Sequence, residues 1–403
     1  MSTSKQVLLN YLTKGNPRLN ITACSKGRNT KSTKAYPWDQ PTFIVKWREF
    51  EYEALLSIYG GKLRDVLGQS FELENFHVPR VPFCQIHDEN SLDSLIIKWN
   101  QSMTSKALTA AQRHLKVHHS ETVYFCKGGQ AQWPREAEIK KRPDWAAVKG
   151  FTLARESAQE VRNVLPGDTK LSKKWSSDRI NPGDLDDIEF EDDWYQPLSQ
   201  IFTYCVRSNA RYGYLITDKE LVVVRVSPRD PLKYPWSQSS DAGKRKARKE
   251  TIRRKHAARE PCDKAIIDGC LEYQTIPWDD RKRSQRVDAP RMTANLALWW
   301  LHLLAANDGA IEEDYVPLDE SEWSMETETQ TPTSSFSMLG DSQESQPLAE
   351  SPPARRLRSF TIGSSFAGTK RSRSEEDEGD EGEDDSENDQ PKSSQKRRNR
   401  KKE

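Results

Sequence analysis

The sequence has few cysteines, and none of them is arranged as a metal site. Only six of the 403 residues are Cys, none forms a Cys-x-x-Cys pair, and no His stands at zinc-ligand spacing from a Cys pair. The sequence therefore predicts no structural zinc. Several of these cysteines lie in apolar strings, such as Y-F-C at 124–126. This placement indicates buried thiols in a reducing compartment.

Targeting patterns and long apolar runs are also lacking. The first residues, M-S-T-S-K-Q, do not show the charged-then-apolar pattern of a signal peptide. The longest apolar run, near Leu296–Ala306, is too short and too interrupted to span a bilayer. We therefore expect an intracellular protein without a membrane partner.

Two catalytic motif classes are absent or weak. The sequence contains no His-Arg-Asp and no Asp-Phe-Gly, which excludes a protein kinase. The pair His118-His119 is the one feature that suggests a His-metal finger nuclease. A lone His pair beside a predicted strand is more often structural or exposed, and we favour that interpretation.

The net charge of +1 hides a strong asymmetry along the chain. Residues 306–403 contain 13 Lys/Arg and 24 Asp/Glu, which gives a net charge of −11. Residues 1–305 contain the other 49 Lys/Arg and 37 Asp/Glu, which gives a net charge of +12. A basic body with an acidic tail indicates an anionic partner, and nucleic acid is the one we favour. The alternative is that 31% charged residues simply solvate a large surface.

One stretch combines acidic, basic and amide side chains in a suggestive order. Its strings are R-P-D-W at 142–145, L-P-G-D-T-K at 165–170 and Q-I-F-T-Y at 200–204. An Asp follows a Pro, a second Asp precedes a Lys by two residues, and a Gln and a Tyr share one face of a predicted helix. Pro-Asp and Asp-x-Lys are each common, so a coincidental loop and a surface pair form the alternative. The Gln-Tyr helix strengthens the pattern.

These residue types suit metal-dependent cleavage of a phosphodiester. Asp144 and Asp168 would bind Mg²⁺ or Mn²⁺ from neighbouring strands, since Mg²⁺ needs only one or two carboxylates. The metal would activate the attacking water. Lys170, on the same side of its strand as Asp168, would orient the water or steady the phosphate. Gln200 and Tyr204 would position the metal-bound water or the nucleic-acid backbone.

The surrounding chain predicts a mixed α/β sheet layered with helices. Apolar periodicity and end signals predict helices at Trp47–Tyr59, from about Leu92 with Ser91 as its cap, at Pro197–Ser208 and at Thr293–Ala306. Predicted strands lie at Thr122–Cys126, Trp145–Val148, Val161–Leu165, Tyr212–Thr217, Leu221–Val226 and Leu271–Trp278. Trp299 and Trp300 are expected to be packing residues inside a buried helix.

Composition divides the chain into four regions. Residues 1–40 predict a flexible N-terminal lead that is ordered in part around Val7–Leu12, and residues 41–91 predict a helical and extended lead-in. Residues 92–306 form the expected core domain. Residues 307–403 are dominated by Ser, Thr, Pro, Glu and Gln, which predicts a disordered tail.

Charge runs outside the core suggest partners and location. The acidic run at 184–193 is typical of a solvated insertion, whereas the basic run at 244–259 would grip phosphates or serve as a solvated linker helix. Basic clusters at 370–373 and 396–402 favour nuclear localisation through an import receptor, with the cytoplasm as the alternative. The acidic block at 375–385 would hold histones or shield a basic surface.

Longer strings resemble a known family. R-P-D-W, L-P-G-D-T-K-L-S-K-K-W, W-Y-Q-P-L-S-Q-I-F-T-Y-C, R-Y-G-Y-L-I-T-D-K-E-L-V-V-V-R-V, T-I-P-W and N-L-A-L-W-W-L-H-L-L-A-A resemble fungal proteins with a PD-(D/E)XK nuclease-like domain. The likeness covers about Leu92–Ala306 and includes the Gln-x-x-x-Tyr helix of RecB-type enzymes. It implies a restriction-endonuclease-like fold and a Mg²⁺-dependent nuclease, with Asp144, Asp168 and Lys170 as catalytic residues supported by Gln200 and Tyr204.

The resemblance also leaves alternatives open. Most such families use a Glu on the helix before the strands, but Leu92 to His114 contains none. Glu121, or Glu51 and Glu53 on the earlier helix, would have to substitute. The main hypothesis is a nuclease acting on DNA in preference to RNA. The alternatives are a catalytically inactive nuclear protein that binds nucleic acid or chromatin, and an interaction scaffold that uses the tail.

Overall fold

The structure is a computed structural model that describes the body of the chain with gaps. The described residues are 3–22, 38–77, 79–131, 141–150, 162–184, 193–230, 233, 260–278, 292–315 and 318. The chain divides into two units, Met1–Thr329 and Gln330–Glu403. The second unit lies outside the described residues. So do the basic run at 244–259 and nearly all of the acidic run at 184–193.

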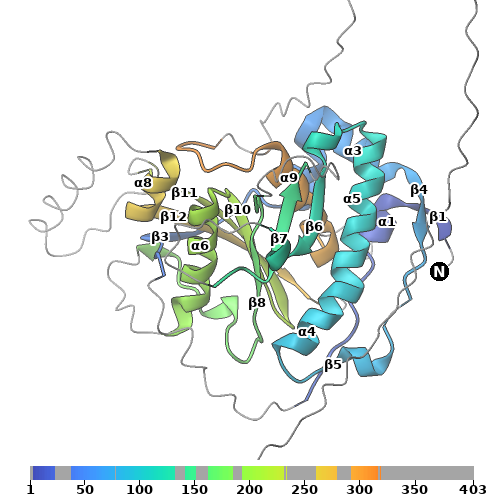
Figure 1. The fold of residues 1–403 in the computed structure, drawn as a ribbon, viewed down its shortest axis with the longest axis horizontal. Coiled ribbons are helices and arrows are strands. Elements are labelled where there is room, and N and C mark those ends of the chain that lie inside the picture. Colours follow the sequence, from blue (N-terminus) through green and yellow to red (C-terminus); the bar gives the residue numbers. More distant parts are fainter. Residues whose placement is uncertain are drawn as a thin grey trace, which may run out of the picture. The chain divides into compact units, whose positions relative to one another are not determined.

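A mixed β-sheet forms the centre of the body (Figure 1). Across the sheet, the described strands are β6 (Val123–Lys127), β7 (Trp145–Lys149), β8 (Gly167–Thr169), β10 (Tyr212–Ile216), β11 (Glu220–Pro228), β12 (Gly269–Pro277), β3 (Phe43–Lys46) and the two-residue β9 (Gly183–Asp184). β8 pairs with β10 and β12 with β3 in parallel, and the other neighbours are antiparallel. The predicted mixed α/β sheet is confirmed.

Helices cover both faces of this sheet. One face carries α1 (Leu8–Leu12), α2 (Tyr52–Ser57), α3 (Lys62–Gly68), α4 (Glu89–Ile96), α5 (Ser102–His114) and α9 (Ala294–Asn307), and the other carries α6 (Gln196–Ser208) and α8 (Pro261–Ile267). A π-helical turn at Ile97–Gln101 joins α4 to α5. Small two-stranded sheets pair β1 (Thr3–Val7) with β4 (Ser70–Glu74) and β2 (Asn20–Ile21) with β5 (Gln85–Ile86). Short 3₁₀ turns lie at Ile58–Gly61, Val81–Cys84, His119–Glu121, Gly128–Gln130, Ser177–Arg179 and Asp193–Tyr195.

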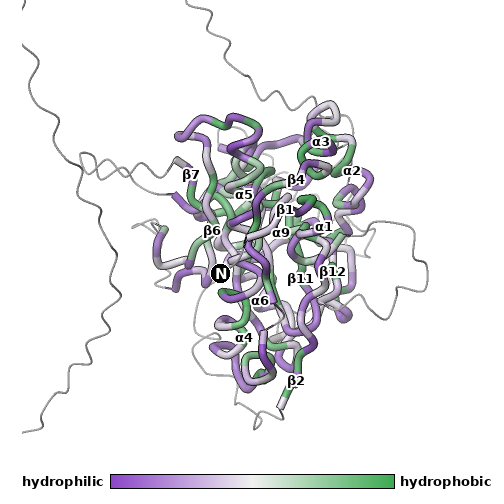
Figure 2. Tube along the Cα trace, turned by 90° about the vertical axis from the view of Figure 1, so that its right-hand side faces the viewer, coloured by the Kyte–Doolittle hydropathy of each residue, from purple (hydrophilic) through white to green (hydrophobic). Residues whose placement is uncertain are grey.

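The two faces of the sheet divide the apolar side chains by alternation along each strand. Tyr214 and Ile216 belong to the core cluster that contains α5 and α9. Leu215, between them, belongs to the cluster that contains α6. Figure 2 shows the hydropathy of the residues along the chain. The sheet is therefore buried on both sides, and any polar side chain within it needs a partner.

Helix α9 is the central packing element of the first cluster. Thr293 caps its start by accepting a hydrogen bond from the Leu296 N–H at 3.2 Å. Trp299 and Trp300 are fully buried, and Phe50 stacks on Trp300 with ring centroids 4.4 Å apart. The prediction that both tryptophans serve packing is confirmed. No helix among the described residues has the length and apolarity needed to cross a membrane.

The N-terminal lead, expected to be ordered in part around Val7–Leu12, is ordered there as α1 and also beyond that stretch. Leu8, Tyr11 and Leu12 of α1 are fully buried in the same cluster as α5 and α9. Asn16 accepts hydrogen bonds from Trp99 Nε1 at 3.0 Å and from the Asn100 amide at 3.1 Å. The segment belongs to the core because Leu8, Tyr11 and Leu12, at the i, i+3, i+4 spacing of one helix face, pack together on the apolar cluster.

The packing also does not follow the predicted boundary between a lead-in and a core at residues 91 and 92. Leu55 and Leu63, from α2 and α3, are fully buried in the cluster that contains Leu92 and Leu108. One continuous apolar cluster therefore crosses the expected boundary. A local change in composition along the chain does not reveal such packing between distant segments.

Most predicted elements lie where the sequence placed them, but some of their ends differ. The helix predicted at Trp47–Tyr59 is the shorter α2, which begins at Tyr52. The predicted strand at Val161–Leu165 does not extend up to Pro166, because its final residues form a bend and a single bridge. The regular strand β8 instead begins at Gly167, after the proline. Cys84, Cys205 and Cys270 are buried, as predicted, whereas Cys126, in the apolar string at 124–126, and Cys262 are only partly buried.

Candidate functional site

The two acidic residues of the motif lie side by side in the sheet. Asp144 immediately precedes β7, and Asp168 is the central residue of β8. Because Trp145 pairs with Gly167 in an antiparallel ladder, the residue before Trp145 lies beside the residue after Gly167. The structure thus brings Asp144 and Asp168 together, although 23 other residues separate them in the sequence.

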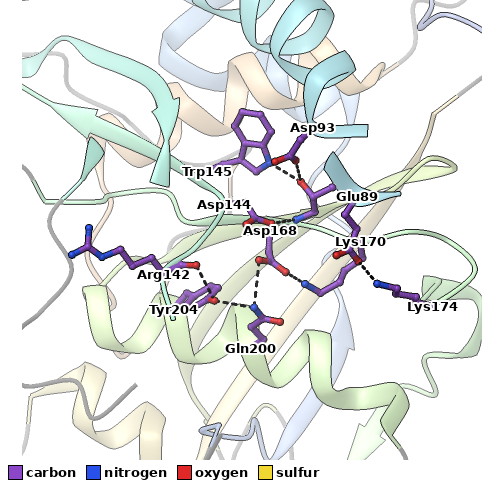
Figure 3. Close-up of polar contacts among 11 residues, drawn as sticks. Glu89, Asp93, Arg142, Asp144, Trp145, Asp168, Lys170, Lys174, Gln200 and Tyr204 are labelled. Carbon is purple, nitrogen blue, oxygen red and sulfur yellow. Dashed lines mark hydrogen bonds and ion pairs between the residues drawn. The ribbon is translucent and has the colours of Figure 1, made fainter. Parts of the chain in front are cut away.

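Asp168 points from the sheet toward α6. It pairs in register with Leu215, whose side chain packs on the α6 side. Its Oδ1 accepts a hydrogen bond from Gln200 Nε2 at 3.4 Å, and its Oδ2 forms an ion pair with Lys170 (Figure 3). Both partners thus contact the same buried carboxylate, one from its own strand and one from the helix.

Gln200 and Tyr204 form one hydrogen-bonded unit on α6. Gln200 Nε2 donates to the Tyr204 hydroxyl at 2.8 Å, and that hydroxyl donates to the Arg142 carbonyl at 3.2 Å. Arg142 lies two residues before Asp144, so the helix is tied to both halves of the motif (Figure 3). Gln200 Oε1 is buried and has no hydrogen-bond partner among the described residues. All five predicted site residues therefore lie in one cluster.

Burial and neighbouring charges control the ionisation of the centre. Burial raises the pKa of Asp168 well above its ordinary value, the nearby Asp144 carboxylate raises it further, and Lys170 opposes both. Burial lowers the pKa of Lys170, but the carboxylates of Asp168, Glu89 and Asp144 together outweigh this effect, so that the net change is upward. Lys170 therefore keeps its positive charge. The buried Asp168 carboxyl needs a neighbouring positive charge to stabilise its ionised form.

A further carboxylate, Glu89, lies at the centre's edge. Its charge raises the pKa of Lys170, and its Oε1 pairs with Lys174 Nζ at 3.2 Å (Figure 3). Glu89 is the first residue of α4, the helix predicted to start near Leu92. The predicted start was wrong. Asp88 is the cap, since it accepts a hydrogen bond from the Ser91 N–H at 2.8 Å while Ser91 Oγ accepts from the Asp88 N–H at 3.0 Å.

The sequence contained a signal for this helix start. Asp88 and Ser91 stand three residues apart, which is the spacing of a reciprocal capping box, and Glu89 occupies the favoured acidic first turn. The residues that we expected to replace a helix Glu lie elsewhere. Glu121 pairs with Lys149, and Glu51 and Glu53 lie at the start of α2.

The loop after Lys170 is fixed to the sheet by two carboxylates. Asp218 accepts hydrogen bonds from the Ser172 N–H and hydroxyl, both at 2.6 Å. Glu220 accepts from the Ser177 N–H at 2.6 Å and from its hydroxyl at 2.8 Å. Lys174 lies between these two anchors, so its ammonium group is held close to Glu89.

The donor set fits a hard divalent cation that keeps most of its water. Among the described residues, no group of three or more His, Cys, Asp and Glu is arranged to hold a metal ion. Mg²⁺, however, needs only one or two protein carboxylates together with water and substrate oxygens. Asp144 and Asp168 supply this number, and the buried, unpartnered Gln200 Oε1 supplies an acceptor beside them. The two imidazoles of His118 and His119, by contrast, are exposed and pack on each other with ring centroids 4.0 Å apart.

The comparisons with known proteins gave no relatives. No family model, no curated protein and no solved structure matches this chain.

Proposed function

We propose that this protein is a Mg²⁺- or Mn²⁺-dependent nuclease that cleaves phosphodiester bonds, acting on DNA in preference to RNA. The observation that supports the proposal most strongly is the buried Asp168 carboxylate, which contacts Lys170 and Gln200 and lies beside Asp144 on the neighbouring strand. A purely structural sheet would place apolar side chains there, because burying like charges together costs stability unless a cation joins them.

The order of the elements supports a restriction-endonuclease-like core. The strands β6, β7, β8 and β10 lie next to one another, α4 and α5 pack on one face, and α6 packs on the other. The acidic residues come from two neighbouring strands and the Gln-Tyr pair from the following helix. This arrangement agrees with the PD-(D/E)XK resemblance of the sequence.

Each residue of the centre has a distinct role in the proposed reaction. Asp144 and Asp168 hold the metal, and Glu89 adds a carboxylate from the start of α4. A bound metal supplies an acidified water and stabilises charge on the phosphate. Lys170 keeps its proton and orients the attacking water or the phosphate. Gln200 Oε1 accepts a hydrogen bond from the water, while the amide nitrogen of Gln200 donates to the Tyr204 hydroxyl.

Two lysines at the centre suit an anionic substrate. Lys170 and Lys174 pair with Asp168 and Glu89 respectively. In the metal-free protein these pairs balance the carboxylates. Added cationic charge at the carboxylates would compete with the lysines and leave their ammonium groups available for phosphate oxygens. Such contacts bind a nucleic-acid backbone independently of sequence and weaken with salt.

The proposal is tested by cleavage of labelled single- and double-stranded DNA and RNA by the full chain with Mg²⁺ or Mn²⁺. Cleavage is expected for the wild type and should be lost in Asp168→Asn and Lys170→Met. Glu121→Gln is the matched control, because Glu121 forms an exposed ion pair with Lys149. Cleavage that persists in both centre variants would contradict the assigned site.

A second candidate is a catalytically inactive nuclear protein that binds nucleic acid or chromatin. It is favoured by the absence of a preformed three-residue metal group among the described residues. It predicts no cleavage with any metal, and binding that weakens steeply with salt and survives Asp168→Asn. Nuclear location and binding to import receptors or histones remain predictions from the basic and acidic clusters of residues 370–402, which lie outside the described residues.

A further inference from the structure

Thr169 stands between Asp168 and Lys170 in the sequence but faces the opposite side of the sheet. It pairs in register with Ile216, which packs in the cluster of α5 and α9. Its side chain is 1% exposed. A hydroxyl in such an apolar position is costly unless it is hydrogen-bonded, and Val would have the same shape without that cost.

The Thr169 hydroxyl joins three elements. It donates to Asp93 Oδ1 of α4 at 2.6 Å and accepts from Trp145 Nε1 of β7 at 2.9 Å. The direction is fixed, because the indole N–H can only donate and the Asp93 carboxylate can only accept. Asp93 Oδ2 pairs in turn with Lys127 Nζ at 2.6 Å, and that ammonium lies 3.7 Å from the Trp145 ring centre. The network is therefore satisfied at each of these atoms.

The same residue also holds a proposed metal ligand. The backbone N–H of Thr169 donates to Asp144 Oδ2 at 2.9 Å. Thr169 thus contacts Asp144 through its main chain and Asp93 through its side chain. Asp93 lies one helical turn after Glu89, so that both carboxylates share one side of α4.

We propose that Thr169 and Asp93 are positioning residues for the metal centre. Their hydrogen bond fixes α4 against β8, which places Glu89 beside Lys170. It also fixes the Thr169 peptide that orients the Asp144 carboxylate. This inference rests on the proposed function, since it concerns the metal ligands of the same site. Neither residue contacts the substrate in this account.

The test measures binding of Mn²⁺ alone to the full chain by titration calorimetry, beside thermal unfolding of each variant. Thr169→Val is expected to weaken Mn²⁺ binding by about 10- to 100-fold, the usual effect of removing a group that orients a metal ligand. Thr169→Ser keeps the hydroxyl and should restore wild-type affinity. Asp93→Leu, which removes the acceptor of the Thr169 hydroxyl and leaves Thr169 in place, should weaken binding by about 10-fold and provides the test should Thr169→Val fail to fold.

Thr42→Val is the matched control for a merely structural role. The Thr42 hydroxyl also donates a hydrogen bond to a buried carboxylate, that of Asp268, at 2.5 Å. This pair lies near β3 and β12, away from β7 and β8 in the strand order of the sheet. It should lower the unfolding temperature without changing the affinity for Mn²⁺.

Two outcomes separate the claims. If the wild type binds Mn²⁺ and the affinity is unchanged in folded Thr169→Val or in folded Asp93→Leu, the positioning role alone is overturned. A wild-type chain that binds no Mn²⁺ would overturn the proposed function and the positioning role with it.

Discussion

Asp168 is a carboxylate for which burial and charge act in opposite directions. Burial and Asp144 favour the protonated form, whereas Lys170 favours the ionised form. The sequence identified all three residues, because the order Pro-Asp and Asp-x-Lys is visible without a structure. It did not identify Thr169, Trp145 or Asp93 as their support, because these contacts cross the sheet and depend on which face each side chain occupies.

The pKa of Asp168 should respond to its two neighbours with opposite signs. In the metal-free protein, its carboxyl is expected to titrate above the ordinary value of 3.8, so that the ionised form is lost earlier as the pH falls. Asp144→Asn removes a neighbouring negative charge and should lower this pKa. Lys170→Met removes the positive charge and should raise it. Carbon-13 NMR titration of the Asp168 carboxyl measures both shifts, and two shifts of the same sign would contradict this environment.

Gly167 permits the close approach of β8 to β10. A side chain at this position would overlap the ring of Tyr214, which is fully buried. Gly167→Ala should therefore lower the free energy of unfolding by about 1–3 kcal/mol, the usual cost of overpacking. Urea denaturation measures the change. Gly68→Ala is the control, since a methyl group there meets nothing within 4 Å, and an effect of equal size in both variants would contradict the steric explanation.

At the scale of elements, the start of α4 decides where Glu89 lies. The apolar stripe of this helix was visible in the sequence, but periodicity places a helix better than it places a helix end. Ser91 directly precedes the stripe, which predicts it as the cap. Asp88 is the actual cap, and one additional turn carries Glu89 to the edge of the centre.

Removing this cap should affect stability and the site together. Asp88→Ala is expected to cost about 1 kcal/mol of unfolding free energy, whereas Asp88→Asn retains a capping oxygen and should cost less. The effect should fade at low pH, because the Ser91 N–H lowers the pKa of Asp88 and the cap's contribution is lost as the pH falls through that lowered value. Urea denaturation at neutral and acid pH tests this. Equal costs for both variants would show that the oxygen does not cap the helix.

At the scale of the whole molecule, packing between distant segments replaces the regional divisions that composition suggested. The N-terminal helix α1 and the C-terminal helix α9 belong to one core cluster although nearly three hundred residues separate them. Thr293, the cap of α9, donates its hydroxyl to the Leu12 carbonyl at 2.8 Å. No local pattern predicts such pairing, whereas the core strands and α6 were predictable because their own periodicity and turn residues define them.

Removal of residues 1–15 should therefore destabilise the body. Leu8 and Leu12 are fully buried, and their loss alone should cost about 3–6 kcal/mol at about 1.5–3 kcal/mol for each Leu. Urea denaturation followed by circular dichroism measures the cost. A chain that ends at Thr329 is the control, because residues from Gln330 onward form a separate unit, and it should unfold like the full chain. An unchanged midpoint after N-terminal truncation would mean that the segment adds nothing to the core.

The central claim is that Asp144 and Asp168 form a metal centre, and a crystal structure of the full chain grown with Mn²⁺ tests it most directly. The anomalous difference map is expected to show a peak in contact with carboxylate oxygens of both residues, at about 2.0–2.2 Å, and no such peak in Asp168→Asn. A map without a peak between these carboxylates at saturating Mn²⁺ would contradict the claim and favour the inactive nucleic-acid-binding protein.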